Sequence, residues 1–571
     1  MFLVATSATN AYLTRKRKCL RADPGANVDV TMMASLLKKK RPVVFTLLAL
    51  GLIGVFYFYR LDAPVLWSDE SAAAAISRSV LKNGIPSGYD GRNLIAFRNC
   101  NVLGEGLLLK KIPWVQYYVG ALSQYIFGRT TFGARILFVV IGWATFFPLL
   151  GLLRERTHHA HFLTTLLMLS PQIILFQRNA RYYPILILLI VLLLYLVFSE
   201  KISNRVRYGT VIPCSILLFH THPLAAVSTF LALSLASLLV CRRHFRIAIF
   251  GGIVGLVSWL AWYLAIPHIP MQSSQFLFPM ISEDPERWKT IFLRGLFATF
   301  YDIDFINGFP LVVCFIFLIY CLVRKRSALL KIIKDPLCAT ILFNLVIQAL
   351  FNAITIGYET PYRLALLRFM PHLVLLLGIV LFLMIRFTIN NEKVALALFS
   401  VILVTNIFGL SFWYRPSDPK DPREWKYSWW PSVYSELIFP PPDPLKLLIT
   451  EIAQSGSDQD SVLVVRPRFL ADTFTFYLGD KLLIQPNIKI NSPCANEVLK
   501  TIGLDSYKRV LGPPSQIVAF LPNPIPLRGY KKFAFSHYRR RADATRPELT
   551  RHNFHNTGRR EQYFVWYKAS P

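Results

Sequence analysis

The chain of 571 residues is 54% hydrophobic and 14% aromatic, and only 17% of its residues are charged. This composition, with a mean hydropathy of +0.42, excludes a largely disordered chain and is rare for a soluble globular protein. The formal net charge of +31 would suit a nucleic-acid partner, but in membrane proteins Lys and Arg collect in cytoplasmic loops. We therefore expect a polytopic helical membrane protein that contacts membrane lipids and no nucleic acid.

The N-terminal segment, residues 1–41, is basic and lacks the pattern of a cleavable signal peptide. The apolar run that follows it, "PVVFTLLALGLIGVFYFY" from Pro42 to Tyr59, is long enough to span a bilayer. We predict that this run is the first transmembrane helix and that residues 1–41 are cytoplasmic.

A pair of carboxylates, Asp69 and Glu70, follows the first span in "LWSDESAAAAISRSVL". One interpretation is a helix start, because Ser68 and Asp69 are typical capping residues and acids favour the positive end of the helix dipole. The other is catalytic, because transfer from a phosphate-linked donor needs a base for the acceptor hydroxyl. The spacing favours both equally, and the two are compatible.

The aromatic stretch from Ile112 to Gly128 decides the topology. If it lies in the membrane interface, every basic loop falls on one side of the membrane, as the charge rule requires. These loops are residues 38–41, 154–159, 200–207, 241–246, 323–334 and 386–393. We therefore predict an interfacial helix here and about eleven spans, near 42–60, 134–153, 161–177, 184–199, 208–221, 223–240, 247–266, 309–323, 337–355, 365–386 and 393–413.

The outer face then carries the loop 61–133, in which the acids lie, and the motif "FQRNARYYP". Arg178 and Arg181 stand in this motif at the mouth of a span. Such cations can snorkel to the interface beside Tyr182 and Tyr183. Arginine on the outer face nevertheless runs against the charge rule, and its fork binds phosphate in bidentate fashion. We favour a phosphate-binding role.

Other polar groups are expected on the same side. Lys110 and Lys111 come just before the interfacial helix, and Arg368 lies about a turn inside an apolar stretch. A cation at that depth in a membrane is a candidate for function. In "HTHP", His220 and His222 do not share a helix face, so a histidine satisfied at the interface is favoured over a metal site.

The last part of the chain changes character after a Pro/Trp-rich linker. A helix is predicted in "PPPDPLKLLITEIAQSG", then two short strands in "DSVLVVRP" and "KLLIQPN" with the helix "FLADTFTFYLG" between them. These elements predict a small α/β domain outside the membrane, residues 414–571. Its basic end, Tyr538 to Arg560, is interpreted as a solvated surface or an anionic-lipid contact.

Taken in order, these motifs resemble the GT-C superfamily of polytopic glycosyltransferases that use polyprenyl-phosphate sugars. The resemblance is to the group that contains protein O-mannosyltransferases and lipid A aminoarabinose transferases, and it covers most of residues 42–413. It is carried by "SDESAAAAISRSVLKNG", "KKIPWVQYYVGALSQYIFG", "GARILFVVIGWATFFPLLGLL", "QRNARYY" and "LRFMP". At two positions this sequence departs from the family pattern. Asn179 stands where the third-span motif of the family has Glu, and Lys110 stands where some members have an acid just before the outer-loop lysine.

The resemblance implies a fold of about eleven transmembrane helices with interfacial helices in the first outer loop and a C-terminal α/β exoplasmic domain. It implies that Asp69 is catalytic, as a base or through a metal ion, and that Glu70 supports it. The residues implied for the donor phosphate are Lys111, Arg181 and Arg368, and those implied for the cavity are Gln177, Tyr183 and His222. A divalent metal ion stays open as a cofactor, with Asp69 and Glu105 as its candidate ligands. In some members the acid at the position of Lys110 can serve as a metal ligand, and this sequence lacks it.

The function implied is transfer of a sugar, with inversion, from a polyprenyl-phosphate donor to a lipid, glycan or protein acceptor on the outer face of the plasma membrane. Two alternatives stay open. A transporter or flippase of lipid-linked saccharides would also place cations on the outer face, and it usually shows internal repeats. A polymerase or ligase would share the lipid-phosphate chemistry without needing an acid pair after the first span.

Overall fold

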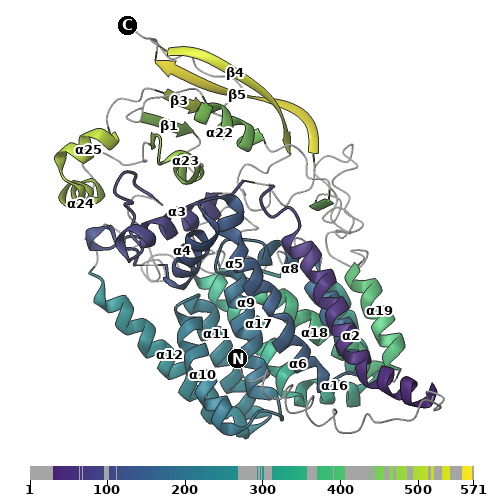
Figure 1. Cartoon of the computed structure of the whole chain (residues 1–571). Helices are drawn as coiled ribbons and strands as arrows, with labels where there is room; N and C mark the ends of the chain where they lie inside the picture. The colour runs from purple at the N-terminus through teal and green to yellow at the C-terminus, as the bar shows by residue number, and fades with distance from the viewer. Residues whose placement is uncertain are drawn as a thin grey trace, which may run out of the picture. The chain divides into compact units, whose positions relative to one another are not determined.

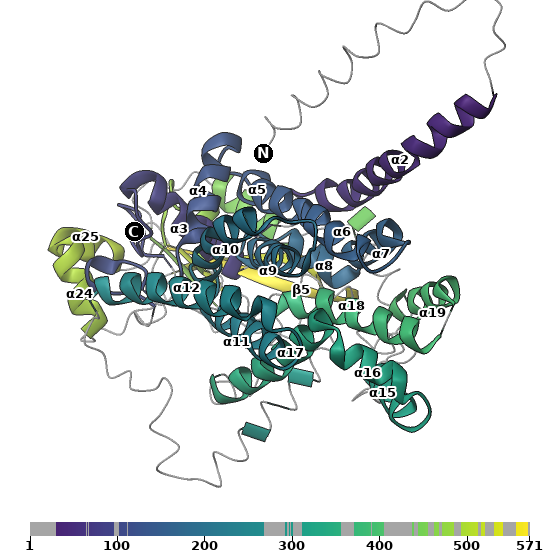
Figure 2. The ribbon, with the colours of Figure 1, turned by 90° about the horizontal axis from the view of Figure 1, so that it is seen from below.

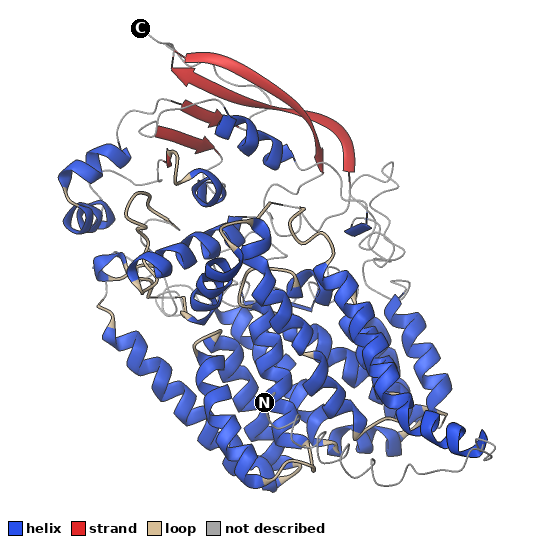
Figure 3. Cartoon of the chain, viewed as in Figure 1, coloured by secondary structure: helices blue, strands red, loops and turns tan. Residues whose placement is uncertain are grey.

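The protein is mostly helical, and the strands that the structure describes all lie in its C-terminal part (Figures 1 and 3). The computed structural model describes residues 30–63, 65–66, 68–95, 102–110, 112–267, 292–293, 296, 299–300, 311–355, 370–389, 391–404, 437–438, 444–454, 462–466, 471–484, 493–511, 516–519, 530–540 and 556–568.

Each predicted span overlaps a helix or a helix pair within these residues. The helices are α2 (Val30–Phe58), α5 (Thr131–Ala144), α6 (Phe146–Arg154), α7 (Ala160–Met168), α8 (Pro171–Gln177), α9 (Tyr183–Phe198), α10 (Asn204–Phe219), α11 (Pro223–Leu239), α12 (Phe245–Ala265), α15 (Leu311–Arg324), α17 (Pro336–Thr355), α18 (Pro371–Thr388) and α19 (Glu392–Val404). Four segments among the described residues are long and apolar enough to cross a membrane by themselves: Thr131–Arg154, Phe245–Ala265, Pro336–Ile354 and Pro371–Thr388. The exact number of spans stays a prediction.

Helix α9 is the centre of the bundle (Figure 2). It is apolar on all sides, and nearly all of its residues are buried against α5, α6, α10, α17 and α18. A helix that is apolar all round must be buried by neighbours. The residues just before α9 therefore have a fixed place at one end of the bundle.

The basic loops lie together at the opposite end of the helical bundle from the residues that precede α9. The Glu392 carboxylate accepts a hydrogen bond from the His158 backbone N–H (3.1 Å) and another from the Thr157 hydroxyl. The Arg156 guanidinium lies 4.0 Å from the Asp335 carboxylate, directly after the basic helix α16 (Arg326–Lys334). These contacts join the loops 154–159, 323–334 and 386–393.

Two further basic loops belong to the same end. The Ser199 hydroxyl donates to Glu155 (2.5 Å), and the Glu200 N–H lies 3.3 Å from the same carboxylate. The ring of Phe198 contacts that of His244, with centroids 5.4 Å apart. Five of the predicted basic loops are therefore neighbours, as a common side of the membrane requires.

Helix α4 (Val115–Phe127) begins and ends at the opposite end of the bundle. The Val115 N–H donates to the His220 carbonyl at the end of α10 (3.4 Å), and Gly128 ends the helix with a φ of 81°, which favours glycine. The Ser123 hydroxyl then donates to the Gly133 carbonyl in the first turn of α5 (2.5 Å). The exposed residues Leu122 and Tyr125 give α4 an apolar outer face, as in a helix that lies in the interface.

The C-terminal part contains a five-stranded sheet with the order β2-β1-β3-β5-β4 (Figure 3). Its elements are α22 (Pro444–Gln454), β1 (Val462–Arg466), α23 (Ala471–Leu478), β2 (Leu483–Ile484), α24 (Pro493–Ile502), α25 (Leu504–Leu511), β3 (Gln516–Ala519), β4 (Tyr530–Arg540) and β5 (Asn556–Lys568). β1 pairs in parallel with β2 and β3, whereas β5 is antiparallel to β3 and β4. The basic end, for which no regular structure was predicted, therefore supplies parts of two long strands.

Candidate active site

The two acids lie in the first turn of helix α3 (Ser68–Asn83). The amino end of a helix carries a partial positive charge, so this position stabilises both carboxylates. Successive residues of a helix point about 100° apart, so the acids face different neighbours. Asp69 and Glu70 therefore have different environments and different uses.

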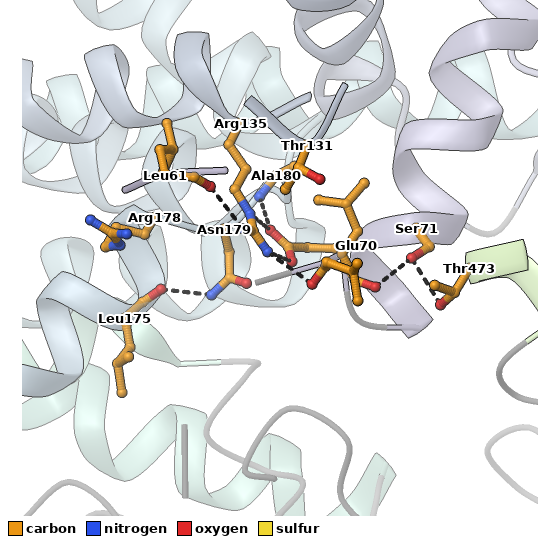
Figure 4. Close-up of polar contacts among 12 residues, drawn as sticks. Leu61, Glu70, Ser71, Thr131, Arg135, Leu175, Arg178, Asn179, Ala180 and Thr473 are labelled. Carbon is orange, nitrogen blue, oxygen red and sulfur yellow. Dashed lines mark hydrogen bonds and ion pairs between the residues drawn. The ribbon is translucent and has the colours of Figure 1, made fainter. Parts of the chain in front are cut away.

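Glu70 is completely buried in a network with Arg135 of α5 (Figure 4). The Arg135 fork donates from Nε to Oε1 (2.9 Å) and from Nη2 to Oε2 (2.6 Å), and the Ala180 N–H donates to Oε1 (2.7 Å). Arg135 also donates from Nη1 to the Leu61 carbonyl (3.0 Å). This bidentate pair fixes the start of α3 to α5 and to the turn before α9, so Glu70 is placed to position the site.

Asp69 reaches the other cation of the motif. Its Oδ2 accepts a hydrogen bond from Arg181 Nη1 at 2.7 Å, and the two side chains are only 11% and 14% exposed. Arg181 Nη1 also lies 3.2 Å from the Tyr183 hydroxyl, and the Tyr182 and Tyr183 rings lie 5.3 Å and 5.5 Å from its guanidinium carbon. An acid and a cation thus meet in an aromatic setting with limited access to water.

The charges of this site are stable near neutral pH. Burial alone would lower the pKa of Arg181. The neighbouring Tyr183 and Asp69 raise this pKa by more than burial lowers it, so it lies above the ordinary value of an arginine. Burial raises the pKa of Tyr117, a residue of α4 that interacts electrostatically with both Arg181 and Asp69. Arg181 is therefore charged and the Tyr117 hydroxyl is neutral.

Three helices begin around Arg181. Tyr182 precedes α9, and its ring lies 5.0 Å from that of His222, which caps α11 by accepting the Ala225 N–H at Nδ1 (3.1 Å). His372 lies in the first turn of α18, close enough to His222 for the two rings to interact electrostatically. His372 is fully buried, and neither ring nitrogen has a hydrogen-bond partner in the described structure. The positive ends of α9, α11 and α18 therefore point to one region, and an unsatisfied imidazole lies in it.

The predicted site residues are brought together in part. Asp69, Arg181, Tyr183 and His222 form one continuous group through Tyr182. Lys111 and Arg368 lie outside the described residues.

Gln177 ends α8 and is fully buried, with neither amide atom hydrogen-bonded in the described structure. It packs against Gly142 of α5 so closely that a Cβ atom there would lie 2.3 Å from its Oε1.

Arg178, Asn179 and Lys110 satisfy backbone groups. Arg178 Nη1 donates to the carbonyls of Phe56 (2.6 Å) and Tyr57 (3.0 Å), and so caps the end of α2. Asn179 donates its side-chain amide to the Leu175 carbonyl (2.6 Å). Lys110 is buried and donates to the Ile266 carbonyl at the end of α12. In the described structure these side chains secure the fold around the site.

A metal ion has no ready set of ligands in the part of the chain that the structure describes, where no three His, Cys, Asp or Glu side chains converge. Asp69 is already paired with a cation, and Glu105 is exposed in a short 3-10 turn. These residues do not fit a metal site by themselves, and the divalent metal ion stays a prediction.

Three residues of the site were not predicted from the sequence. They are Arg135, Tyr117 and His372. A usable signal existed for Arg135, because an arginine within an apolar span calls for a buried partner. Tyr117 and His372 carry no such signal, since tyrosine and histidine are common near the ends of spans.

These features define a multi-pass membrane protein with an acid–arginine site at one end of its helical bundle. No protein-family model matches the sequence, and no curated protein matches it. The crystal structure of ArnT from Cupriavidus metallidurans bound to undecaprenyl phosphate is similar to this chain, with a TM-score of 0.51 and 14% identity over 92% of this chain and 98% of that chain. The chain therefore has the fold of that ArnT structure, and the resemblance seen in the sequence is confirmed at the level of the fold.

Two more solved structures align at lower TM-scores. ArnT from Cupriavidus metallidurans in the apo state aligns with a TM-score of 0.49 and 14% identity over 93% of this chain and 98% of that chain. The archaeal oligosaccharyltransferase AglB from Archaeoglobus fulgidus, in complex with an inhibitory peptide and a dolichol-phosphate, aligns with a TM-score of 0.36 and 10% identity over 85% of this chain and 70% of that chain.

Proposed function

We propose that the protein is a glycosyltransferase that moves a sugar from a polyprenyl-phosphate donor to an envelope acceptor at the outer face of the membrane. The observation that carries this proposal is the pair formed by Asp69 and Arg181, 2.7 Å apart at the end of the bundle away from the basic loops. Such a pair offers a proton acceptor and a phosphate-binding cation within one site. These are the two groups that glycosyl transfer from a lipid phosphate requires.

The donor phosphate is expected to bind at Arg181. A guanidinium fork holds two phosphate oxygens and stabilises the negative charge that grows as the sugar leaves. The amino ends of α9, α11 and α18 add positive potential to the same region. The binding of undecaprenyl phosphate by ArnT, which shares this fold, supports a lipid phosphate as the partner. Lys111 and Arg368 are proposed as further phosphate ligands.

Asp69 is proposed as the base that takes the proton of the acceptor hydroxyl. Attack by that oxygen on the anomeric carbon, in line with the departing phosphate, inverts the anomeric centre. Glu70 does not compete for this role, because it is fully buried and both of its oxygens are bonded to Arg135. Gln177, Tyr183 and His222 are proposed to line the cavity around the sugar.

The two alternative functions, transport and polymerisation or ligation of lipid-linked saccharides, do not require Asp69 as a base. A transporter or flippase would need the cations and the apolar bundle but no base, so the charge of Asp69 would not limit its turnover. A polymerase or ligase would share the lipid-phosphate chemistry without needing an acid pair after the first span. The pairing of Asp69 with Arg181 favours transfer over transport.

The proposal is tested in a strain that lacks the protein. Envelope lipids, glycans and proteins from this strain are compared by mass spectrometry after return of the wild type or of Asp69→Asn. The wild type should restore a glycosyl mass that the deletion strain lacks. Asp69→Asn should fail to restore it while the purified variant still binds undecaprenyl phosphate. Full restoration by Asp69→Asn would contradict the proposal.

A further inference from the structure

The helix that carries the acid pair contacts the C-terminal domain at Ser71 and at Arg78. At its far end, the buried Arg78 donates to the Phe476 carbonyl (2.9 Å) and pairs with Asp480. In the loop that follows, the Asn93 side chain donates to the Gly479 carbonyl (2.8 Å) and accepts the Ile484 N–H (2.8 Å). These contacts anchor α3 and its loop to α23 and β2.

A second set of contacts lies at the start of α3, next to the acids. The Tyr477 hydroxyl accepts the N–H of Leu66 (2.9 Å) and shares a hydrogen bond of 2.7 Å with the Thr131 hydroxyl. Leu66 leads into α3 three residues before Asp69, and Thr131 opens α5 one turn before Arg135. One phenol thus ties together the two elements whose side chains form the Glu70–Arg135 pair.

The residues around this connection are buried and hydrogen-bonded. The Ser71 hydroxyl, fully buried two residues after Asp69, donates to the Leu66 carbonyl (2.9 Å) and lies 3.0 Å from the Thr473 hydroxyl (Figure 4). Val65 belongs to the hydrophobic core of the C-terminal domain, together with Leu463 and Phe474. Packed cores transmit small displacements instead of absorbing them. A shift of α23 would therefore move the first turn of α3.

We infer that Tyr477 is a positioning residue, through which the C-terminal domain holds Asp69 in register with Arg181. This inference rests on the proposed function, because it assigns Tyr477 to the geometry of that same site. Tyr477 is not expected to touch the substrate. Its hydroxyl fixes the approach to α3 relative to α5, and a displacement of about 1 Å in a catalytic group can cost on the order of 100-fold in rate.

The test uses the full-length protein with Tyr477→Phe, which removes the hydroxyl and keeps the ring. Transfer is measured from a synthetic undecaprenyl-phosphate sugar, of the sugar identified in the deletion strain, to envelope material of that strain. We expect kcat to fall about tenfold or more, with the Kd for undecaprenyl phosphate and the thermal midpoint near the wild-type values. Tyr125→Phe, a change of the same kind at a residue that is 78% exposed on α4, is the matched control and should change none of the three.

A double-mutant cycle separates positioning from general weakening. Thr131→Val removes the other side of the same hydrogen bond, so the double variant should be scarcely slower than Tyr477→Phe alone. A wild-type kcat in Tyr477→Phe would overturn the inference, as would a loss of kcat that only parallels a loss of thermal stability and of undecaprenyl phosphate binding. The proposed function fails separately, if Asp69→Asn keeps full transfer.

Discussion

Asp69 and Arg181 are each other's ion-pair partner, at 2.7 Å, although one is expected to act on the acceptor and the other on the donor. An arriving phosphate must therefore compete with Asp69 for the guanidinium. Once the phosphate holds Arg181, the carboxylate loses part of its counter-charge and is more available to an acceptor hydroxyl. Donor binding and activation of the base are then linked in one pair of side chains.

The first prediction concerns Arg181. Arg181→Lys keeps the charge and loses the fork, whereas Arg181→Ala loses both. We expect the alanine variant to bind undecaprenyl phosphate about 10-fold to 100-fold more weakly and to lose nearly all turnover, because hydrogen bonds to charged groups contribute about 1.5–3 kcal/mol. Lysine should retain part of both.

The control for this prediction is Arg205→Ala, an exposed arginine among the basic loops, measured in the same titration of undecaprenyl phosphate. It should leave affinity and turnover unchanged. Equal affinity and turnover in the wild type and Arg181→Ala would show that Arg181 only anchors the protein at the interface.

The second prediction concerns Asp69. Asp69→Asn keeps the shape of the side chain and removes its charge, so kcat should fall by about two to four orders of magnitude. Because the neutral amide no longer competes for Arg181, undecaprenyl phosphate should bind at least as tightly as to the wild type. Equilibrium binding and single-turnover transfer measure the two effects. Near-normal transfer by a well-folded variant would refute the role as base, and weaker lipid binding would refute the competition.

The third prediction separates Glu70 from Asp69. Glu70→Gln leaves Arg135 buried without its counter-charge, and breaking such a pair costs about 3–5 kcal/mol. The thermal midpoint in detergent should therefore fall clearly in Glu70→Gln and little in Asp69→Asn, whose pair is partly exposed. A Glu70→Gln protein of wild-type stability that has lost transfer would instead place Glu70 in the chemistry.

The fourth prediction is topological. Arg156 lies among the basic loops near Asp335, whereas Asp62 is exposed at the end where the acids lie. In a background from which the eight cysteines are removed, an impermeant thiol reagent added to intact cells should label Asp62→Cys and not Arg156→Cys. Outward labelling at position 156 would mean that α4 crosses the membrane.

The fifth prediction concerns pH. Burial, with a contribution from Arg181, lowers the pKa of His222 to about 4 from its ordinary value of 6.5. Between these values the unfolded chain binds the proton and the folded protein does not, so stability is complete above pH 6.5 and falls as the pH drops toward 4. The slope due to one such group is about 1.4 kcal/mol per pH unit.

His222→Asn tests this prediction, because asparagine also caps helices but does not titrate. Its thermal midpoint should fall less steeply than that of the wild type between pH 6.5 and 4. Identical slopes in the two proteins would mean that His222 does not contribute to the acid sensitivity.

The approximate positions of the helices, and the reason that the basic loops gather at one end, could be predicted from the amino-acid sequence. Apolar runs such as the one from Pro184 to Phe198 must be buried or lie in lipid, and this requirement depends only on local composition. The place of Asp69 and Glu70 in the first turn of a helix was also readable, because capping depends on neighbours along the chain. The charge rule placed the first outer loop and the "QRNARYY" motif on one side of the membrane, and the structure pairs Asp69 and Arg181 of these two segments.

The partner of each charged side chain could not be predicted from the sequence, because it depends on how distant segments pack. Adjacent acids on a helix diverge by about 100°, and in the folded protein Glu70 pairs with Arg135 of α5 while Asp69 pairs with Arg181. Packing also made Val65 part of the C-terminal core. Such pairings join residues far apart in the chain, and their energy depends on burial and geometry that no local pattern encodes.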